Sequence, residues 1–273
     1  MDRDPRSPGP AHRPRLATMV FLPDNIGIAT DAYDRLPLAE ALERLSAHTT
    51  LAEIYSGDRH DLLDAGNRRA AIASGMRFTV HRPFEDLMPG SLHERERRHA
   101  VAEHRRHLEA AAEIGAICYA VHPDVDERTG PRDPRVIAAL GRTIEDLAKL
   151  QREYGVRVVL ENMPGAGHSH FVAPGDLDLG ELGFLLDTGH AAISGVLHDF
   201  LVAPDLDLTH VHLHDNRGPA DAHDPHLPLG RGIVDVRDVL DVARVRHATV
   251  ILELTSEADV RESLAYLERR RLI

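Results

Sequence analysis

The sequence predicts a single α/β domain folded as a (β/α)8 TIM barrel. Eight short apolar runs of strand length recur along the chain, and segments with helical spacing or loops rich in Gly and Pro separate them. Strands that alternate with helices favour a parallel sheet. The length of 273 residues is about that of one such barrel. No glycine-rich dinucleotide fingerprint follows the first run, which weakens the alternative of an open Rossmann sheet.

The first third of the chain contains three of these runs. The first strand is expected at residues 16–23, in the apolar run LATMVFLP. A helix follows over 34–48, because Leu and Ala recur there at spacings of three and four residues. The second strand is expected at 50–55, and a short helix after it ends near Gly75. The third strand, at 77–84, leads into a loop that contains proline.

A capping box predicts the start of the next helix at Ser91, with Glu94 three residues later, and Gly115 predicts its end. A strand follows at 116–122.

Asp133 and Pro134 predict the start of another helix, with proline at its first position and Gly155 past its end. The remaining strands are expected at 156–160, 182–186, 208–214 and 249–252, and a final helix at 256–270.

Composition restricts the class of protein. Residues 1–15 lack the apolar segment of a secretory signal and read as a disordered tail, so that the barrel spans 16–273 and the cytoplasm is the default compartment. No apolar run reaches transmembrane length. The lone cysteine, Cys118, lies in an apolar run and is expected in the core. A net charge of −12 argues against nucleic-acid binding without excluding a local basic groove.

Ligand-type side chains stand at the ends of six of the eight runs. In a barrel of this kind the active site lies at the carboxyl ends of the strands. A polar residue at the end of an apolar strand is costly unless it is paired or bound to a metal. We therefore expect one shared site that contains His81, His122, Glu161, Asp187, His212 and Glu253.

Residues 210–232 read HVHLHDNRGPADAHDPHLPLGRG and form the densest cluster of imidazole and carboxylate. Three alternate histidines, at 210, 212 and 214, point to one side of the expected strand. The loop that follows carries more of both types. Borderline metals bind His nitrogen and carboxylate oxygen together, so the stretch predicts one wall of a divalent-metal site.

The ordered segments VHRPF, VHPD, LENMPG, LDTGHA, HVHLHDN, DPHLPLGRG and ILEL resemble the xylose-isomerase-like TIM barrels. The resemblance runs from about residue 16 to the end of the chain. This superfamily includes sugar and sugar-phosphate isomerases and epimerases, and also endonuclease IV, a zinc AP endonuclease.

The resemblance implies two possible ligand sets. As in the epimerases, one divalent metal (Zn, Mn or Mg) would be held by Glu161, Asp187, His212 and Glu253, and the two Glu residues would also transfer protons. Endonuclease IV holds three zinc ions, and its additional ligand positions match His81, His122, His190, Asp224 and His226. The cofactor is thus expected to be one to three divalent ions.

Within this pattern His212 is preferred to His214 as the ligand, because it stands three residues before Asp215, as in the family's H-x-x-D motif. Four residues are candidates for substrate contact: His190, His214, Arg217 and Arg231. His210 is expected to be buried and hydrogen-bonded. Asp221 and His223 are expected to be solvated loop residues.

Three functions stay open from the sequence. The first is a sugar or sugar-phosphate isomerase or epimerase that works through an enediolate. The second is a zinc phosphodiesterase, and the third is a metal-bound sugar- or cofactor-binding protein without turnover. A Schiff-base aldolase is excluded, since the only lysine, Lys149, lies in a helix outside the barrel. The loops after the second and third strands are mostly acidic, which favours a small sugar-like substrate over nucleic acid. The oligomeric state stays open.

Overall fold

The expected barrel is confirmed by a computed structural model, which describes residues 20–82, 87–125, 132–165, 169–176, 178–221 and 223–273. Eight parallel strands close into one sheet in chain order. The strands are β1 (Ile26–Ala29), β2 (Leu51–Tyr55), β3 (Arg77–His81), β4 (Cys118–Val121), β5 (Arg157–Glu161), β6 (Gly183–Asp187), β7 (Leu208–Leu213) and β8 (Thr249–Leu252).

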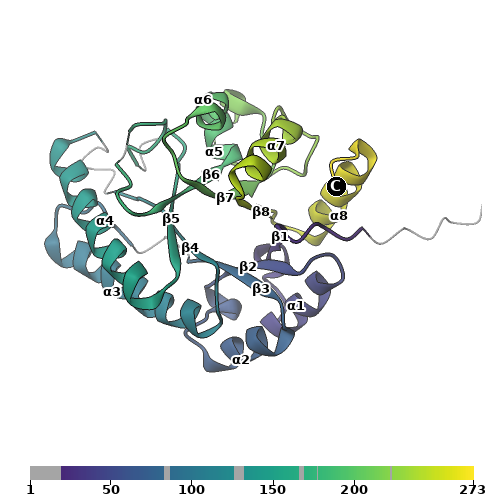
Figure 1. Ribbon diagram of the computed structural model, residues 1–273, viewed down its shortest axis with the longest axis horizontal. Coiled ribbons are helices and arrows are strands. Elements are labelled where there is room, and N and C mark those ends of the chain that lie inside the picture. The colour runs from purple at the N-terminus through teal and green to yellow at the C-terminus, as the bar shows by residue number, and fades with distance from the viewer. Residues whose placement is uncertain (1–19, 83–86, 126–131, 166–168, 177, 222) are drawn as a thin grey trace, which may run out of the picture.

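Helices surround this barrel, and Figure 1 shows α3 and α4 packed side by side on one flank and α8 beside β1 and β8. The α-helices are α1 (Leu38–Ser46), α2 (Ala65–Ser74), α3 (Glu94–Glu113), α4 (Pro134–Tyr154), α5 (Thr188–Ile193), α6 (Leu197–Val202), α7 (Val236–Arg246) and α8 (Glu257–Arg270). Short 3-10 helices lie at Thr30–Tyr33, Asp58–His60 and Gly218–Ala220.

The prediction of the first strand was wrong. The described part of the run 16–23 has no regular structure, and β1 lies further on, at Ile26–Ala29. Leu22 is buried, and its N–H donates to the carbonyl of His48, so the described end of this run packs against the segment that precedes β2. Within β1, a Cβ on Gly27 would come within 2.5 Å of the carbonyl oxygen of Leu51 on β2. The expected tail at 1–15 lies outside the described residues.

The capping box predicted at Ser91 was also wrong. Helix α3 begins at Glu94, and His93 occupies the N-cap without a side-chain hydrogen bond. The Ser91 hydroxyl instead accepts the N–H of His93 and donates to Glu96 Oε2 at 2.6 Å. Ser91 therefore stabilises the turn before the helix rather than its first turn.

The helix expected at 34–48 is shorter in the structure, at Leu38–Ser46, whereas the boundaries of α4 follow the local signals closely. Asp133 caps α4 by accepting the N–H of Arg135, and Gly155 ends that helix in the left-handed region with φ 71°. Cys118 is fully buried, as expected.

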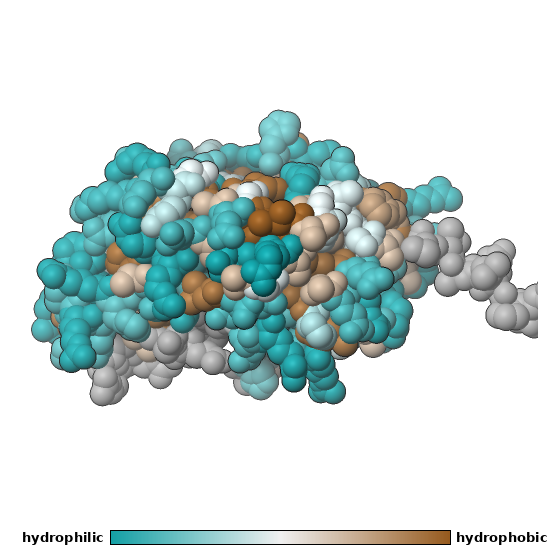
Figure 2. Space-filling view, turned by 90° about the horizontal axis from the view of Figure 1, so that it is seen from below, coloured by the Kyte–Doolittle hydropathy of each residue, from teal (hydrophilic) through white to brown (hydrophobic). Residues whose placement is uncertain are grey.

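The face in Figure 2 is mostly hydrophilic, and its hydrophobic residues form small groups. In the part of the chain that the structure describes, no helix is long and apolar enough to cross a membrane.

Candidate metal centre

The carboxyl ends of the strands bring the six expected residues into one cluster. Glu161 and Asp187 are the last residues of β5 and β6, and the others lie at or just beyond the ends of their strands. Parallel strands in one closed sheet place all their carboxyl ends at the same mouth of the barrel. The clustered side chains, each at most 13% exposed, are His81, His122, Glu161, Asp187, His212 and Glu253.

A first group of ligand atoms joins the ends of β3, β4 and β5. Nε2 of His122 lies 3.0 Å from Glu161 Oε2, and Nε2 of His81 lies 3.5 Å from the same oxygen. The two imidazole nitrogens are 3.1 Å apart. Two nitrogens and one oxygen that converge in this way could hold one cation.

A second, central group contains Glu161, Asp187 and His212. Nδ1 of His212 lies 3.8 Å from Glu161 Oε2 and 3.9 Å from Asp187 Oδ2. These three atoms are buried and have no hydrogen-bond partner among the described residues. Glu253 adds an oxygen 3.1 Å from the same nitrogen. Buried polar atoms without partners are costly, so this donor set fits a divalent cation.

The remaining residues of the predicted ligand sets complete the wall at β6 and β7. Asp187, His190 and Asp224 form a third group of converging ligand atoms, and His214, His226 and Glu253 form a fourth. His214 Nε2 lies 2.8 Å from Asp224 Oδ2, and its ring stacks on that of His226 at 4.2 Å. His214 therefore belongs to the cluster as well, beside the preferred His212.

Asp215 anchors the loop after β7, which carries Asp224 and His226 over the barrel mouth. Its carboxylate, which is buried, accepts the backbone N–H groups of Gly230, Gly232 and Val234 at 2.7 to 3.0 Å. Leu227 also pairs with Asp215 as an antiparallel bridge. The loop is thus anchored at both ends, and the residues between are carried back across the mouth of the barrel.

The carboxylates of the cluster differ in their tendency to ionise. Burial alone would raise the pKa of Glu161 and of Glu253, but His122 beside the first and His212 beside the second hold both pKa values well below the usual range. For Asp187 burial prevails and raises the pKa to about 6.

Most of the imidazoles are held in the charged form by these acids. Burial opposes charge, but Asp187 and Glu161 raise the pKa of His190 to about 9, and Asp187 and Asp224 do the same for His214. His226 differs, since burial lowers its pKa to about 4. A cation that bound here would replace those protons, so metal binding and proton release are coupled at this site.

One buried residue of the site was missed from the sequence. Glu53 on β2 is 1% exposed and contacts two histidines of β7, with Oε2 2.8 Å from His210 Nε2 and Oε1 2.8 Å from His212 Nε2. The only signal was a single acid inside the apolar run LAEIY. The expectation for His210 is confirmed, because it is buried and hydrogen-bonded to Glu53 and Thr249.

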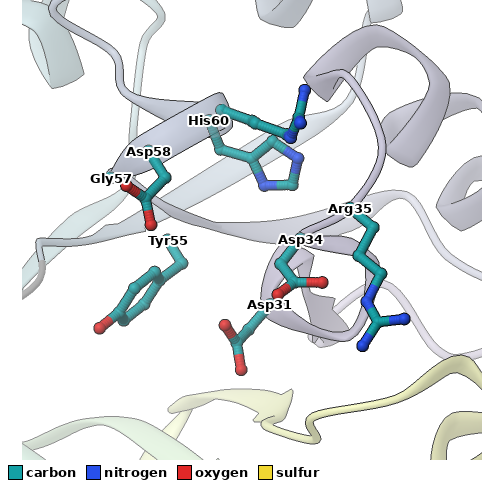
Figure 3. A pocket seen from close by; sticks show the side chains of 8 residues that line it. Asp31, Asp34, Arg35, Tyr55, Gly57, Asp58 and His60 are labelled. Atoms are coloured by element: carbon teal, nitrogen blue, oxygen red, sulfur yellow. The ribbon is translucent and has the colours of Figure 1, made fainter.

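A cavity of about 850 Å3 opens beside the cluster, at the ends of β1 and β2 (Figure 3). It connects to the candidate ligands through Tyr55, whose ring stacks on His81 with centroids 5.4 Å apart. In Figure 3, Tyr55 and Asp31 project toward the same side. Burial, with the nearby charges of Glu253 and Asp34, raises the pKa of Asp31 to about 6. The residues that line the cavity are Asp31, Asp34, Arg35, Tyr55, Gly57, Asp58, Arg59 and His60. The sequence had not singled out Asp31 or Tyr55.

The two arginines proposed as substrate contacts lie at the surface. Arg217 pairs with Asp221 at 3.0 Å, and Arg231 pairs with Glu262. Both side chains are more than half exposed, so each would have to leave its acid to reach a ligand in the barrel. His223 is exposed, as expected for a loop residue.

Lys149 lies on α4 and pairs with Asp146 at 2.9 Å, outside the barrel, as the sequence predicted.

Comparisons with known proteins give the same architecture. The family model described as xylose isomerase-like TIM barrel matches residues 50–270. The uncharacterized proteins MJ1614 and MJ1311 of Methanocaldococcus jannaschii are each 28% identical to the chain. The alignments cover 81% of this chain and 87% of MJ1614, and 83% of this chain and 77% of MJ1311.

Three solved structures of similar fold are an epimerase-like protein, a zinc-soaked protein and an endonuclease. A D-tagatose 3-epimerase-like protein is 24% identical, with a TM-score of 0.76 over 89% of this chain and 96% of its own. The TTHB071 protein from Thermus thermophilus, soaked with ZnCl2, is 27% identical, with a TM-score of 0.65 over 90% and 97%. Endonuclease IV from the same organism is 22% identical, with a TM-score of 0.62 over 89% and 99%.

Proposed function

Because the chain belongs to the family of xylose isomerase-like TIM barrels, we propose that it is a divalent-metal-dependent isomerase or epimerase of a sugar or sugar phosphate. The central group carries this proposal. Glu161 and Glu253 both face Nδ1 of His212, at 3.8 and 3.1 Å, so that two carboxylates stand beside one cation position.

The resident cation would be held by Glu161, Asp187, His212 and Glu253. When bound, a divalent cation polarises a substrate carbonyl and lowers the pKa of the adjacent C–H. One glutamate would accept that proton, which leaves an enediolate, and the other would return a proton to the opposite face. Both carboxyl pKa values are held low, so both groups are ionised at neutral pH and either can accept the first proton. The glutamate that returns a proton must first take one up, from a substrate hydroxyl or from water.

The cavity beside the cluster favours a polyhydroxylated ligand. Its walls offer three carboxylates as hydrogen-bond acceptors, two guanidinium groups as donors and the ring of Tyr55. This mixture suits sugar hydroxyls, whereas three acidic side chains oppose a DNA backbone. The D-tagatose 3-epimerase-like structure has the same fold.

Solvent isotope exchange tests the proposal without knowledge of the substrate. The manganese-loaded protein would be incubated in D2O with a panel of free ketoses and ketose phosphates and examined by NMR. We expect deuterium at the carbon next to the carbonyl of at least one compound, and loss of that exchange with a chelator or in Glu161→Gln. Absence of exchange across the panel, together with hydrolysis of bis(p-nitrophenyl) phosphate, would reject the isomerase in favour of a phosphodiesterase.

A zinc phosphodiesterase is the second candidate, and one observation favours it. Five residues beyond the four-ligand set also gather at the barrel mouth, and these are His81, His122, His190, Asp224 and His226. Clustered zinc ions can generate a hydroxide and stabilise an in-line displacement at phosphorus. The zinc-soaked TTHB071 structure and endonuclease IV have the same fold.

Abasic DNA separates an AP endonuclease from either small-molecule enzyme. With a net charge of −12 and acids at Asp31, Asp34 and Asp58 around the cavity, we expect no incision of an abasic duplex at physiological salt. Efficient incision at the abasic position, inhibited by a chelator, would reverse the order of the two candidates. The two acids of the loop after the third strand, at positions 85 and 86, lie outside the described residues.

A further inference from the structure

We infer that Glu53 is a positioning residue, which fixes the ring orientation and the tautomer of His212 for metal binding. The contact spans the barrel interior, because Glu53 lies on β2 and His212 on β7. This inference rests on the proposed metal site, and its test measures metal binding without any substrate.

The geometry assigns different tasks to the two nitrogens of His212. Nδ1 faces the carboxylates of the central group, 3.1 Å from Glu253 Oε2. Nε2 faces away from them and lies 2.8 Å from Glu53 Oε1, an ion-pair contact in which the ring N–H does not meet hydrogen-bond geometry. A neutral imidazole carries one proton, so a ring that gives its Nδ1 lone pair to a metal must carry that proton on Nε2. Glu53 is the group placed to receive it.

Two further contacts keep Glu53 in place. Its Oε2 accepts the hydroxyl of Thr79 at 2.9 Å and the Nε2–H of His210 at 2.8 Å. His210 in turn contacts the Thr249 hydroxyl through Nδ1.

A metal site inside the network itself is the alternative, since Glu53, His210 and His212 also converge. The hydrogen bonds of Glu53 and His210 argue against a metal ion at this position. Oε2 is already shared by Thr79 and His210, and His210 Nδ1 is engaged by Thr249. The barrel interior of a TIM fold is normally filled by packed apolar side chains, so a charged network is retained there at a cost. Carboxylates that hold metal-ligating histidines in this way typically contribute about 10- to 100-fold in metal affinity.

Competition between the protein and a chromophoric chelator for zinc tests the inference. We expect Glu53→Gln to weaken zinc binding by roughly 10- to 100-fold, because an amide can donate to Nε2 and so leave the proton on Nδ1. Glu53→Asp keeps the charge on a side chain that is one methylene shorter. The zinc affinity of this variant should therefore lie between those of wild type and Glu53→Gln. Thr79→Val is the matched control, since it removes one hydrogen bond to the same carboxylate and leaves His212 in contact.

Two outcomes would overturn the inference. If Glu53 only fills the barrel, both Glu53 variants will lower the unfolding temperature of the metal-free protein while zinc affinity stays at the wild-type value. If Glu53 does not act through His212, Glu53→Gln will weaken zinc binding equally in wild type and in a His212→Ala background. The inference requires that the substitution has no further effect once His212 is removed. Should Glu53→Gln fail to fold, Glu53→Asp in both backgrounds decides the same question.

Discussion

At the scale of single residues, Glu161 is the point at which the ligand groups meet. Its Oε2 faces His81, His122 and His212, and its Oε1 lies 3.2 Å from His190 Nδ1. A carboxylate with neighbours on both oxygens can bridge two cation positions. Glu253 is less enclosed, with 13% of its side chain exposed, and so it is the glutamate more open to substrate.

We predict that Glu161→Gln and Glu253→Gln each lower turnover by at least about 100-fold, because a neutral amide can neither hold the cation as firmly nor accept a proton. The circular dichroism spectrum and cooperative unfolding should stay as in wild type, since the barrel core consists of apolar strand residues. Near-wild-type turnover in either variant would remove that glutamate from the mechanism.

At the scale of elements, the turn from β6 into α5 depends on Gly189. A Cβ at this position would lie 2.1 Å from both Asp224 Oδ2 and His214 Nε2. The motif LDTGHA thus needs glycine so that the start of α5 can approach the loop that carries Asp224.

Gly189→Ala should therefore displace Asp224 and His214 and reduce the number of zinc ions bound, while the barrel still folds. Gly141→Ala on α4 is the control, because nothing lies within 4 Å of the added methyl and the helix should gain up to about 1 kcal/mol. Unchanged zinc content in Gly189→Ala, measured by elemental analysis, would mean that this loop is not part of the metal site.

A buried histidine between α3 and β4, His104, affects the stability of the protein in acid. His104 Nδ1 lies 3.0 Å from the Tyr119 hydroxyl, and burial, together with Arg82, lowers the pKa of His104 to about 3. The unfolded chain binds this proton near the ordinary histidine pKa of 6.5 and the folded protein does not. His104 therefore lowers the free energy of unfolding as the pH falls below about 6.5.

We predict that His104→Gln, which can still hydrogen-bond to Tyr119, reduces the loss of unfolding free energy between pH 7 and pH 5 by at most about 2 kcal/mol. Urea unfolding at the two pH values measures this difference. His99→Gln, at an exposed position of the same helix, should leave the loss unchanged. Equal behaviour of the two variants would show that His104 is protonated in the folded protein.

At the scale of the whole molecule, the open question is how many cations the barrel mouth holds. Glu161 and Asp187 each belong to two of the groups of converging ligand atoms and so join three of them. Glu253 of the fourth group lies 3.1 Å from His212 of the central group, so the four groups are parts of one site. These groups contain more ligand-type side chains than the four that one zinc ion normally takes. We therefore favour a multinuclear site over a single cation.

Protein purified without chelator should contain more than one equivalent of zinc or manganese. His226→Ala should lower the content by about one equivalent, since His226 lies in an outer group, whereas His212→Ala should disrupt the central position. A single equivalent in wild type that His226→Ala leaves unchanged would assign the outer residues to substrate contacts and support a one-metal site.

The sequence by itself determined the architecture and most of the cluster. Apolar runs bounded by Gly and Pro located seven of the eight strands, and the residue at the end of a strand needs no tertiary information to be found. Because a closed parallel barrel brings those ends together, His81, His122, Glu161 and Asp187 could be grouped before their distances were known.

Only the tertiary structure decided the contacts that cross the barrel. Glu53 and His210 are 157 positions apart, and no local pattern states which inward side chains of β2 and β7 meet. The location of β1 was decided in the same way, since the backbone of Ile26–Ala29 pairs with β2 and β8, whereas Leu22, in the apolar run before it, bonds to His48. Such contacts depend on the tilt and register of the closed sheet, which are properties of all eight strands together.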